Sequence, residues 1–149
     1  MKKQLLSFLT MFLFCVDNAS AQTTRYVKQN STGDGTSWTN ASGDLQAMIN
    51  SSIPGDQVWV AGGTYYPIRR ADSLDVISPN NRHNAFVLKN GVKIYGGFIG
   101  SNETLLTQRD STRKTNNTIL SGDIGIVGDD ADNAYHVVIS GNNVGAGEL

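Results

Sequence analysis

Four short apolar segments, each ending in a glycine, most constrain what this chain can fold into. They are residues 58–62, 92–96, 118–122 and 137–141. Apolar side chains in these segments favour short β-strands that bury at least one face. Their glycines follow one another at intervals of 34, 26 and 19 residues, the range of one repeat per turn of a solenoid. The pattern therefore predicts parallel strands stacked in one direction, about 4.8 Å apart.

Residues 85–100 hold two apolar strands separated by Asn90-Gly91. This dipeptide is typical of a two-residue antiparallel hairpin, because both residues tolerate positive φ. It also suits a corner between strands that do not pair, and the recurring strand-plus-glycine units favour the corner. The polar segments 69–84 and 101–117 are predicted surface excursions. An antiparallel sandwich or barrel is the competing fold, but hairpins need far shorter connections than these.

One amphipathic helix is expected before the first strong strand. Leu45, Met48 and Ile49 share one face. Ser42 is the expected N-cap, and Asp44 lies in the first turn, where the helix dipole favours negative charge. A helix of about two turns is marginal alone in water, so we expect it to cover the open end of the strand stack.

Residues 1–21 have the pattern of a secretory signal peptide. Lys2 and Lys3 precede an apolar core at 5–16, and Ala19-Ser20-Ala21 offers a cleavage site before Gln22. A membrane-spanning helix needs about 20 apolar residues, and this core is shorter. Cleavage would remove the only cysteine, Cys15, and leave ten basic and twelve acidic residues. We therefore expect a secreted or outer cell-surface bacterial protein, with no membrane span after cleavage and no basic patch for nucleic acid.

The succession of motifs resembles a known family. The segments that carry the resemblance are 56–65, 86–98, Glu103-Thr104, 108–110 and 120–124. They resemble the opening coils of the right-handed parallel β-helix proteins of the pectin-lyase-like superfamily, found in large secreted surface proteins of the Bacteroidota. The resemblance implies an all-β, right-handed parallel β-helix (solenoid) over residues 22–149, with a short N-terminal capping α-helix around Leu45 to Ile49. Because family members are usually longer, it also implies that Leu149 ends only the N-terminal part of such a domain.

No set of residues converges on a catalytic, cofactor-binding or metal site, so we predict none. The acidic residues cluster at Asp123, Asp129, Asp130 and Asp132. Their spacing lacks the glycine of an EF-hand loop, and a solvated acidic loop is the preferred interpretation. Arg109 and Asp110 are expected to hold an excursion against the strands. His83 and His136, 53 residues apart, are interpreted as ordinary polar side chains.

Two glycine motifs and the aromatic residues also suggest no site. Residues 121–123 lack the nucleophile elbow, and residues 96–100 lack the lysine and the following helix of a phosphate loop. Trp38 is expected to anchor its polar loop on the core. The remaining aromatic residues offer either a strip for sugar stacking or support for the long loops, and support is preferred. They are Trp59, Tyr65, Tyr66 and Tyr95.

Two functions remain open. The favoured one is a non-catalytic secreted or cell-surface β-helix module for adhesion, display or glycan contact, whose partners are polysaccharides or cell-surface glycans. The alternative is the N-terminal part of a polysaccharide lyase or glycoside hydrolase whose catalytic coils lie beyond residue 149. A lyase needs a positioned base and neutralised charge, and a glycosidase needs paired carboxylates.

Overall fold

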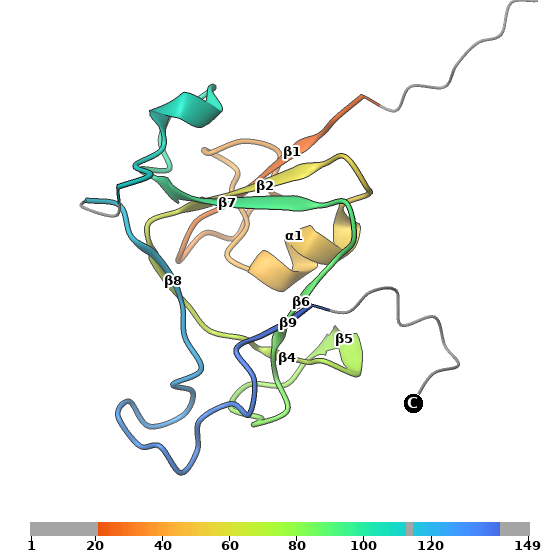
Figure 1. Cartoon of the computed structure of the whole chain (residues 1–149), viewed down its shortest axis with the longest axis vertical. Helices are drawn as coiled ribbons and strands as arrows, with labels where there is room; N and C mark the ends of the chain where they lie inside the picture. The colour runs from red at the N-terminus through yellow and green to blue at the C-terminus, as the bar shows by residue number, and fades with distance from the viewer. Residues whose placement is uncertain (1–20, 113–114, 141–149) are drawn as a thin grey trace, which may run out of the picture.

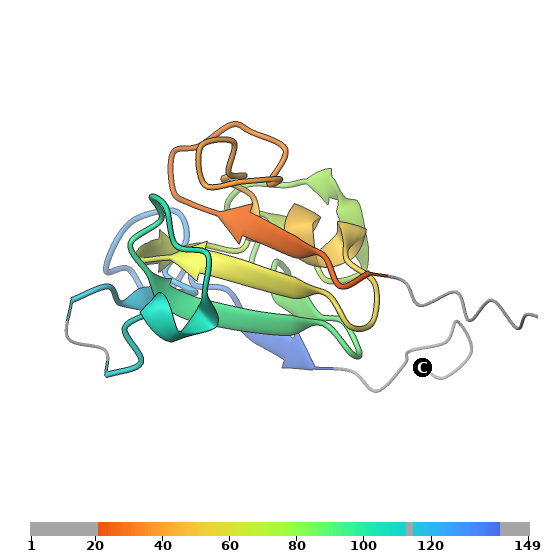
Figure 2. The same cartoon turned by 90° about the horizontal axis from the view of Figure 1, so that it is seen from above.

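Parallel strand pairing dominates the structure, a computed structural model that describes residues 21–112 and 115–140. Strands β1 (Thr24–Val27), β2 (Gln57–Ala61) and β7 (Lys93–Phe98) form a parallel sheet in the order β1-β2-β7 (Figure 1). Figure 2 shows the three strands side by side. Val58 is paired with Arg25 on one side and with Ile94 on the other. The common direction expected for the strands at Val58 and Ile94 is therefore confirmed.

The remaining strands form two-stranded sheets. Strand β3 (Gly63–Tyr65) pairs in parallel with β8 (Thr118–Leu120), and β6 (Phe86–Leu88) pairs in parallel with β9 (Val138–Ser140). Strand β4 (Arg69–Arg70) pairs with β5 (Ser73–Ile77) as an antiparallel hairpin. A one-turn 3-10 helix, η1 (Leu106–Gln108), lies in the excursion after β7.

The predicted all-β, right-handed parallel β-helix is wrong. In the parts of the chain that the structure describes, the strands belong to four separate sheets of two or three strands, with no solenoid. Only the first two predicted units pair with each other, because the third pairs with β3 and the fourth pairs with β6. The excursion at 69–84 is not a simple loop either, since it contains the β4–β5 hairpin. Residues 1–20 of the predicted signal peptide lie outside the described residues.

The corner at Asn90-Gly91 was predicted correctly. Strands β6 and β7 on either side of it pair with other strands and not with each other. The turn is closed by the Val92 amide, which donates to the Lys89 carbonyl at 3.2 Å. Gly91 has φ +74°, and a Cβ there would lie 2.7 Å from Cβ of Pro54. A residue without a side chain is therefore needed where the chain turns from one sheet to the next.

Helix α1 (Leu45–Ser51) is present where the sequence predicts it, but it begins differently. Its N-cap is Asp44, whose carboxylate accepts from the Ala47 amide at 2.9 Å. The predicted N-cap, Ser42, instead accepts from the Asp44 amide at 3.1 Å. Asp44 is thus outside the first turn, in a position where aspartate is among the preferred residues.

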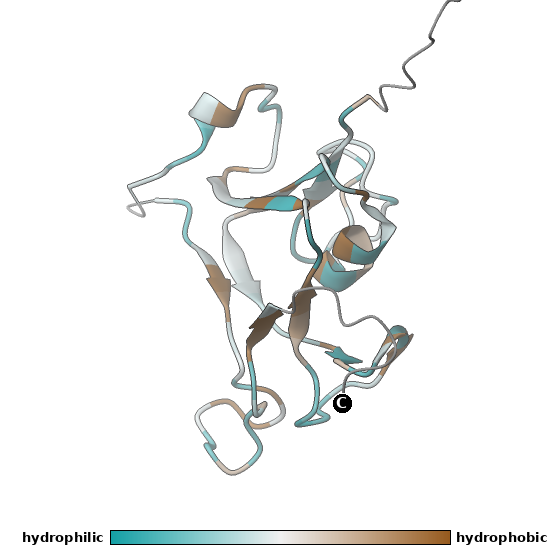
Figure 3. Ribbon diagram, turned by 45° about the vertical axis from the view of Figure 1, so that its right-hand side comes forward, coloured by the Kyte–Doolittle hydropathy of each residue, from teal (hydrophilic) through white to brown (hydrophobic). Residues whose placement is uncertain are grey.

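The helix covers a core shared by several sheets. Figure 3 shows hydrophobic segments on the helix and strands in the middle of the molecule. The buried members of this core come from α1, β1, β2, β3 and β6. They are Val27, Leu45, Met48, Ile49, Val58, Val60, Tyr65 and Phe86. The helix therefore packs into the interior between sheets, and it does not cover the end of a strand stack.

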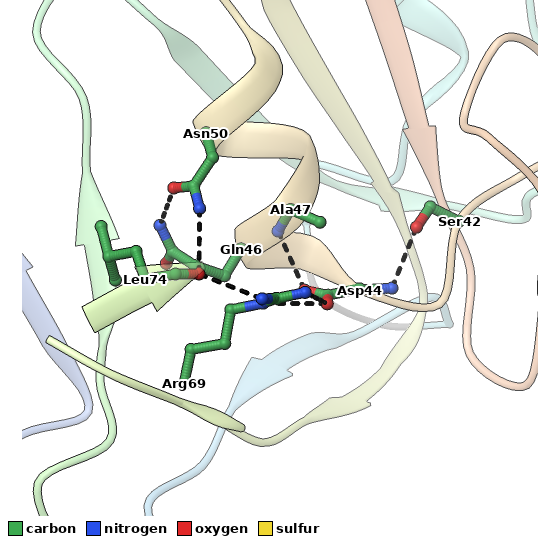
Figure 4. A network of polar contacts seen from close by, with 7 residues as sticks. All are labelled: Ser42, Asp44, Gln46, Ala47, Asn50, Arg69 and Leu74. Atoms are coloured by element: carbon green, nitrogen blue, oxygen red, sulfur yellow. Dashed lines mark hydrogen bonds and ion pairs between the residues drawn. The ribbon is translucent and has the colours of Figure 1, made fainter. Parts of the chain in front are cut away.

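A polar network ties the start of the helix to the β4–β5 hairpin (Figure 4). Arg69 donates through Nε and Nη2 to the Asp44 carboxylate, at 3.1 and 2.6 Å, and through Nη1 to the Leu74 carbonyl at 3.1 Å. The Arg69 and Asp44 side chains are only 12% and 20% exposed. The ion pair is consequently more shielded from water than a surface pair, and its loss costs more.

Replacing Asp44 separates its two roles. Asparagine caps a helix as well as aspartate does, so Asp44→Asn removes mainly the charge opposite Arg69. We expect Asp44→Ala to lower the free energy of unfolding by about 2 kcal/mol and Asp44→Asn by about half of that. Urea denaturation of both variants measures the difference. Unchanged stability of Asp44→Asn would show that the charge contributes nothing, and equal losses would show that the cap contributes nothing.

Candidate functional site

Of the four aromatic residues proposed as a strip for sugar stacking, Trp59 and Tyr65 are buried, Tyr95 is half-buried and Tyr66 is 40% exposed. The Trp59 ring is 5% exposed and stacks on Phe98, with ring centroids 4.6 Å apart and planes inclined by 10°. Tyr65 is 4% exposed and donates to the Ala61 carbonyl at 3.0 Å. Burial raises the pKa of Tyr65 to about 12. The Trp59 and Tyr65 rings therefore support the structure, as the preferred interpretation expected for them.

Trp38 anchors a second structural feature, the nest loop, which comprises residues 99–103. Trp38 is buried in a cluster with Trp59 and Phe98, which confirms that it anchors its own polar loop on the core, and its indole also donates to the Glu103 carbonyl at 3.0 Å. Glu103 is 4% exposed, and its carboxylate accepts from four successive amides, those of residues 99–102. Burial raises the pKa of Glu103, but the amide hydrogen bonds outweigh it and the net shift is downward.

Carboxylates of the acidic loop accept hydrogen bonds from backbone amides of the same loop. Both oxygens of the Asp123 carboxylate accept from the Gly128 amide, at 3.0 and 3.1 Å, and Asp132 accepts from the Ile126 amide at 2.7 Å. Ser121 Oγ accepts from the Asp123 amide at 3.2 Å. Among the described residues, no group of three or more His, Cys, Asp or Glu is placed to hold a metal ion.

Arg109 and Asp110 line a cleft of about 670 Å³ with residues 96–97 and 116–119. The Asp110 amide donates to the Gly97 carbonyl at 2.6 Å. Hydrogen bonds from the side chain of Thr112 and from Thr115 hold the pKa of Asp110 far below its usual range. Residues 96–100 end β7 and enter the nest loop. These contacts hold the excursion against the strands, in agreement with the sequence-based interpretation.

A second cleft, of about 390 Å³, is lined by side chains that keep exposed rings and polar groups available to a ligand. We call it the β6–β9 cleft because its main residues come just before those two strands. Its lining comprises Ala71, Asp72, Arg82, His83, Asn84, Tyr135, His136 and Ile139. Its volume falls within the range of small-ligand pockets, about 300–1,000 Å³.

Parallel pairing of β6 with β9 builds this cleft. Phe86 is paired with Val138, so the residues that lead into the two strands also run side by side. The Tyr135 amide donates to the Arg82 carbonyl at 2.9 Å, and the Phe86 amide donates to the Val137 carbonyl at 2.9 Å. The chain thereby brings the 82–84 and 135–136 segments to the same end of the two-stranded sheet.

Two side chains of the cleft, those of Arg82 and His83, pack against the ring of Tyr135. Cζ of Arg82 lies 4.3 Å from the centroid of the Tyr135 ring, within the range of a cation–π contact. The His83 ring meets Tyr135 edge-on, with centroids 5.2 Å apart and planes inclined by 60°. Tyr135 is still 55% exposed. A ligand can therefore reach an aromatic ring that a cation and an imidazole hold in place.

Asp72 is the carboxylate of this cleft, and it is already paired. Arg70 donates to its two oxygens through Nε and Nη2, at 2.8 and 2.7 Å. The Arg70 guanidinium holds the pKa of Asp72 below its usual range. A general base near neutral pH needs a pKa close to the working pH, so the pairing disfavours Asp72 in that role.

The floor of the cleft contains a buried amide. Asn84 has no exposed surface, and its Nδ2 donates to the Pro67 and Ser78 carbonyls at 3.2 and 2.6 Å. Its Oδ1 is buried and accepts no hydrogen bond from the residues that the structure describes. Buried acceptors are usually satisfied, and a buried water is the kind of donor that suits this one.

Comparison with known proteins does not assign the chain to a family, because no protein-family model, curated protein or solved structure matches it. The resemblance to the pectin-lyase-like superfamily therefore stays an untested prediction.

The sequence interpretation of His83 and His136 as unrelated polar residues missed their convergence. Both lie in the β6–β9 cleft although 53 residues separate them. Each precedes an apolar strand by a few residues, but nothing in the sequence marks those two strands as partners. Aligning those two strands in parallel would have placed Arg82 and His83 beside Tyr135.

Proposed function

We propose that the chain is an exported, non-catalytic module of the outer cell surface or the secreted fraction, and that it contacts glycans through the β6–β9 cleft. The observation that carries the proposal is the Tyr135 ring, which is exposed and held between Arg82 and His83. Flat rings flanked by hydrogen-bonding groups suit the apolar faces and hydroxyls of sugars, because sites of this kind combine apolar contact with a few oriented polar groups.

The polar groups of the cleft favour recognition over bond breaking. Asp72 is held by Arg70 and is a weak base. In the described residues neither imidazole, that of His83 or that of His136, has a hydrogen bond to a carboxylate that would orient it. Catalytic imidazoles generally have such an orienting partner.

Export is the part of the proposal that rests on the N-terminal pattern, since residues 2–3, 5–16 and 19–21 have the features of a cleavable signal. In the described ranges, no helix is long and apolar enough to cross a membrane.

A binding assay on the exported protein tests the proposal. We expect protein collected outside the cells or from their surface to begin at Gln22 and to bind to an array of oligosaccharides without degrading them. Reducing ends and absorbance of unsaturated products measure degradation. Release of oligosaccharides would favour the lyase or hydrolase alternative, and binding to none of the glycans would refute the proposal.

A further inference from the structure

We propose that the β6–β9 cleft selects acidic sugars, those with a carboxylate or sulfate group, over neutral ones. This inference rests on the proposed function, because it specifies the class of glycan for the same cleft. It is carried by the unbalanced charge of the cleft and by the fixed position of the Arg82 guanidinium.

Charges in the cleft do not cancel. The carboxylate of Asp72 is neutralised by Arg70, with which it forms a two-pronged ion pair. Arg82 therefore contributes a positive charge that no carboxylate of the described lining balances. The chain as a whole has a formal net charge of −1, so the cleft differs in sign from the rest of the protein.

The guanidinium of Arg82 is held on two sides. Its Nε donates to the Asn133 carbonyl at 2.8 Å, and its plane lies near the Tyr135 ring, with Cζ 4.3 Å from the centroid. The side chain is half-buried. Within the described residues its two terminal nitrogens, Nη1 and Nη2, have no acceptor. Two parallel N–H groups in a fixed plane are the geometry that binds a carboxylate or sulfate by two hydrogen bonds.

The remaining lining suits the rest of a sugar ring. Tyr135, His83 and His136 provide flat surfaces, and Ala71 and Ile139 provide small apolar ones. A sugar with one anionic group could place that group on the Arg82 guanidinium and its ring against these surfaces. A phosphorylated peptide would use Arg82 equally well, but a phosphate group has no apolar sugar face to lie against the exposed Tyr135 ring.

Isothermal titration of the full chain with matched ligands tests the inference. The probes are a glucuronate-containing tetrasaccharide with its carboxyl-reduced form, and a sulfated galactan oligosaccharide with its desulfated form. We expect at least one acidic member to bind tenfold or more tightly than its neutral partner. Replacing Arg82→Gln should remove this preference, and Arg82→Lys should keep part of it, because lysine retains the charge but not the planar fork.

Arg109→Gln is the matched control. Arg109 also lies near an aromatic ring, with Cζ 5.6 Å from the Tyr95 centroid, but it lines the other cleft. Its replacement should change affinity less than twofold. Thermal unfolding of each variant verifies that it is folded, and Arg82→Lys keeps the test informative if Arg82→Gln unfolds.

The outcomes separate the two proposals. Equal affinity for acidic and neutral members overturns the acidic selectivity and leaves glycan contact standing. Binding to no saccharide, in this titration and on the array, overturns both proposals. Tighter binding of a phosphorylated peptide than of any saccharide overturns the assignment of the cleft to sugars.

Discussion

Replacing Glu103 with alanine is expected to lower the free energy of unfolding by about 3–5 kcal/mol, because hydrogen bonds to a charged group contribute about 1.5–3 kcal/mol each and bonds that share one acceptor group are not additive. The substitution leaves four successive amides, those of residues 99–102, without the carboxylate that accepts from them. It also loosens the loop whose backbone carbonyl receives the Trp38 indole. Chemical denaturation followed by tryptophan fluorescence measures the loss.

The charge of Glu103 makes its contribution depend on pH. Because its pKa is lowered in the folded protein, its stabilisation is complete above the unfolded pKa, near 4.5, and is lost as the pH falls through the folded pKa. We expect the difference in stability between wild type and Glu103→Gln to be constant from pH 7 to pH 5 and to shrink below about pH 4.5. A difference that grows on acidification would contradict the assigned role.

Gln46→Leu is expected to cost about 3 kcal/mol, since it leaves several buried polar groups unsatisfied. Gln46 is 2% exposed. Its Oε1 accepts from the Val87 amide at 2.8 Å, and its Nε2 donates to the Val87 carbonyl at 3.1 Å. The side-chain amide thus takes the place of a neighbouring strand on one edge of β6, while β9 pairs with the other edge.

A matched glutamine provides the control for this substitution. Gln22 is exposed and donates to the Gly55 carbonyl at 2.6 Å, so Gln22→Leu should cost less than about 1 kcal/mol. Urea denaturation of both variants gives the comparison. Val87 belongs to β6, the strand that directly follows cleft residues 82–84. Gln46→Leu should therefore also weaken glycan binding. Equal stability of the two leucine variants would show that Gln46 does not support β6.

Local features of the fold were predictable because their causes are local. The apolar face of Leu45, Met48 and Ile49 indicated α1, and the glycine at position 91 indicated a corner. The parallel pairing of Val58 with Ile94 followed from two similar strand units. Strand partners beyond these were not predictable, because apolar segments of three residues fit several neighbours equally well. The β4–β5 hairpin was hidden for another reason: β5 has exposed valine and isoleucine, without a buried face to mark it.

The candidate site depended on the same long-range pairing. Arg82, His83, Tyr135 and His136 carry no recognisable motif in the sequence. They become neighbours only through the register of β6 and β9, in which Phe86 is paired with Val138. The aromatic residues were more conspicuous, but their apolar area draws them inside, and Trp59 is buried against Phe98. The type of the aromatic residues therefore predicted that they belong to the core, whereas the cleft could be identified only from the pairing of β6 with β9.

Titration of the ¹⁵N-labelled protein with the acidic tetrasaccharide, followed by two-dimensional NMR, tests the central claim most directly. The predicted result is that the largest amide shifts occur at residues 71–72, 82–84 and 135–136, and that the carboxyl-reduced sugar causes smaller ones. Shifts that gather instead around residues 96–97, 109–111 and 116–119, or no shifts with any sugar, would contradict the claim that the β6–β9 cleft is the binding site.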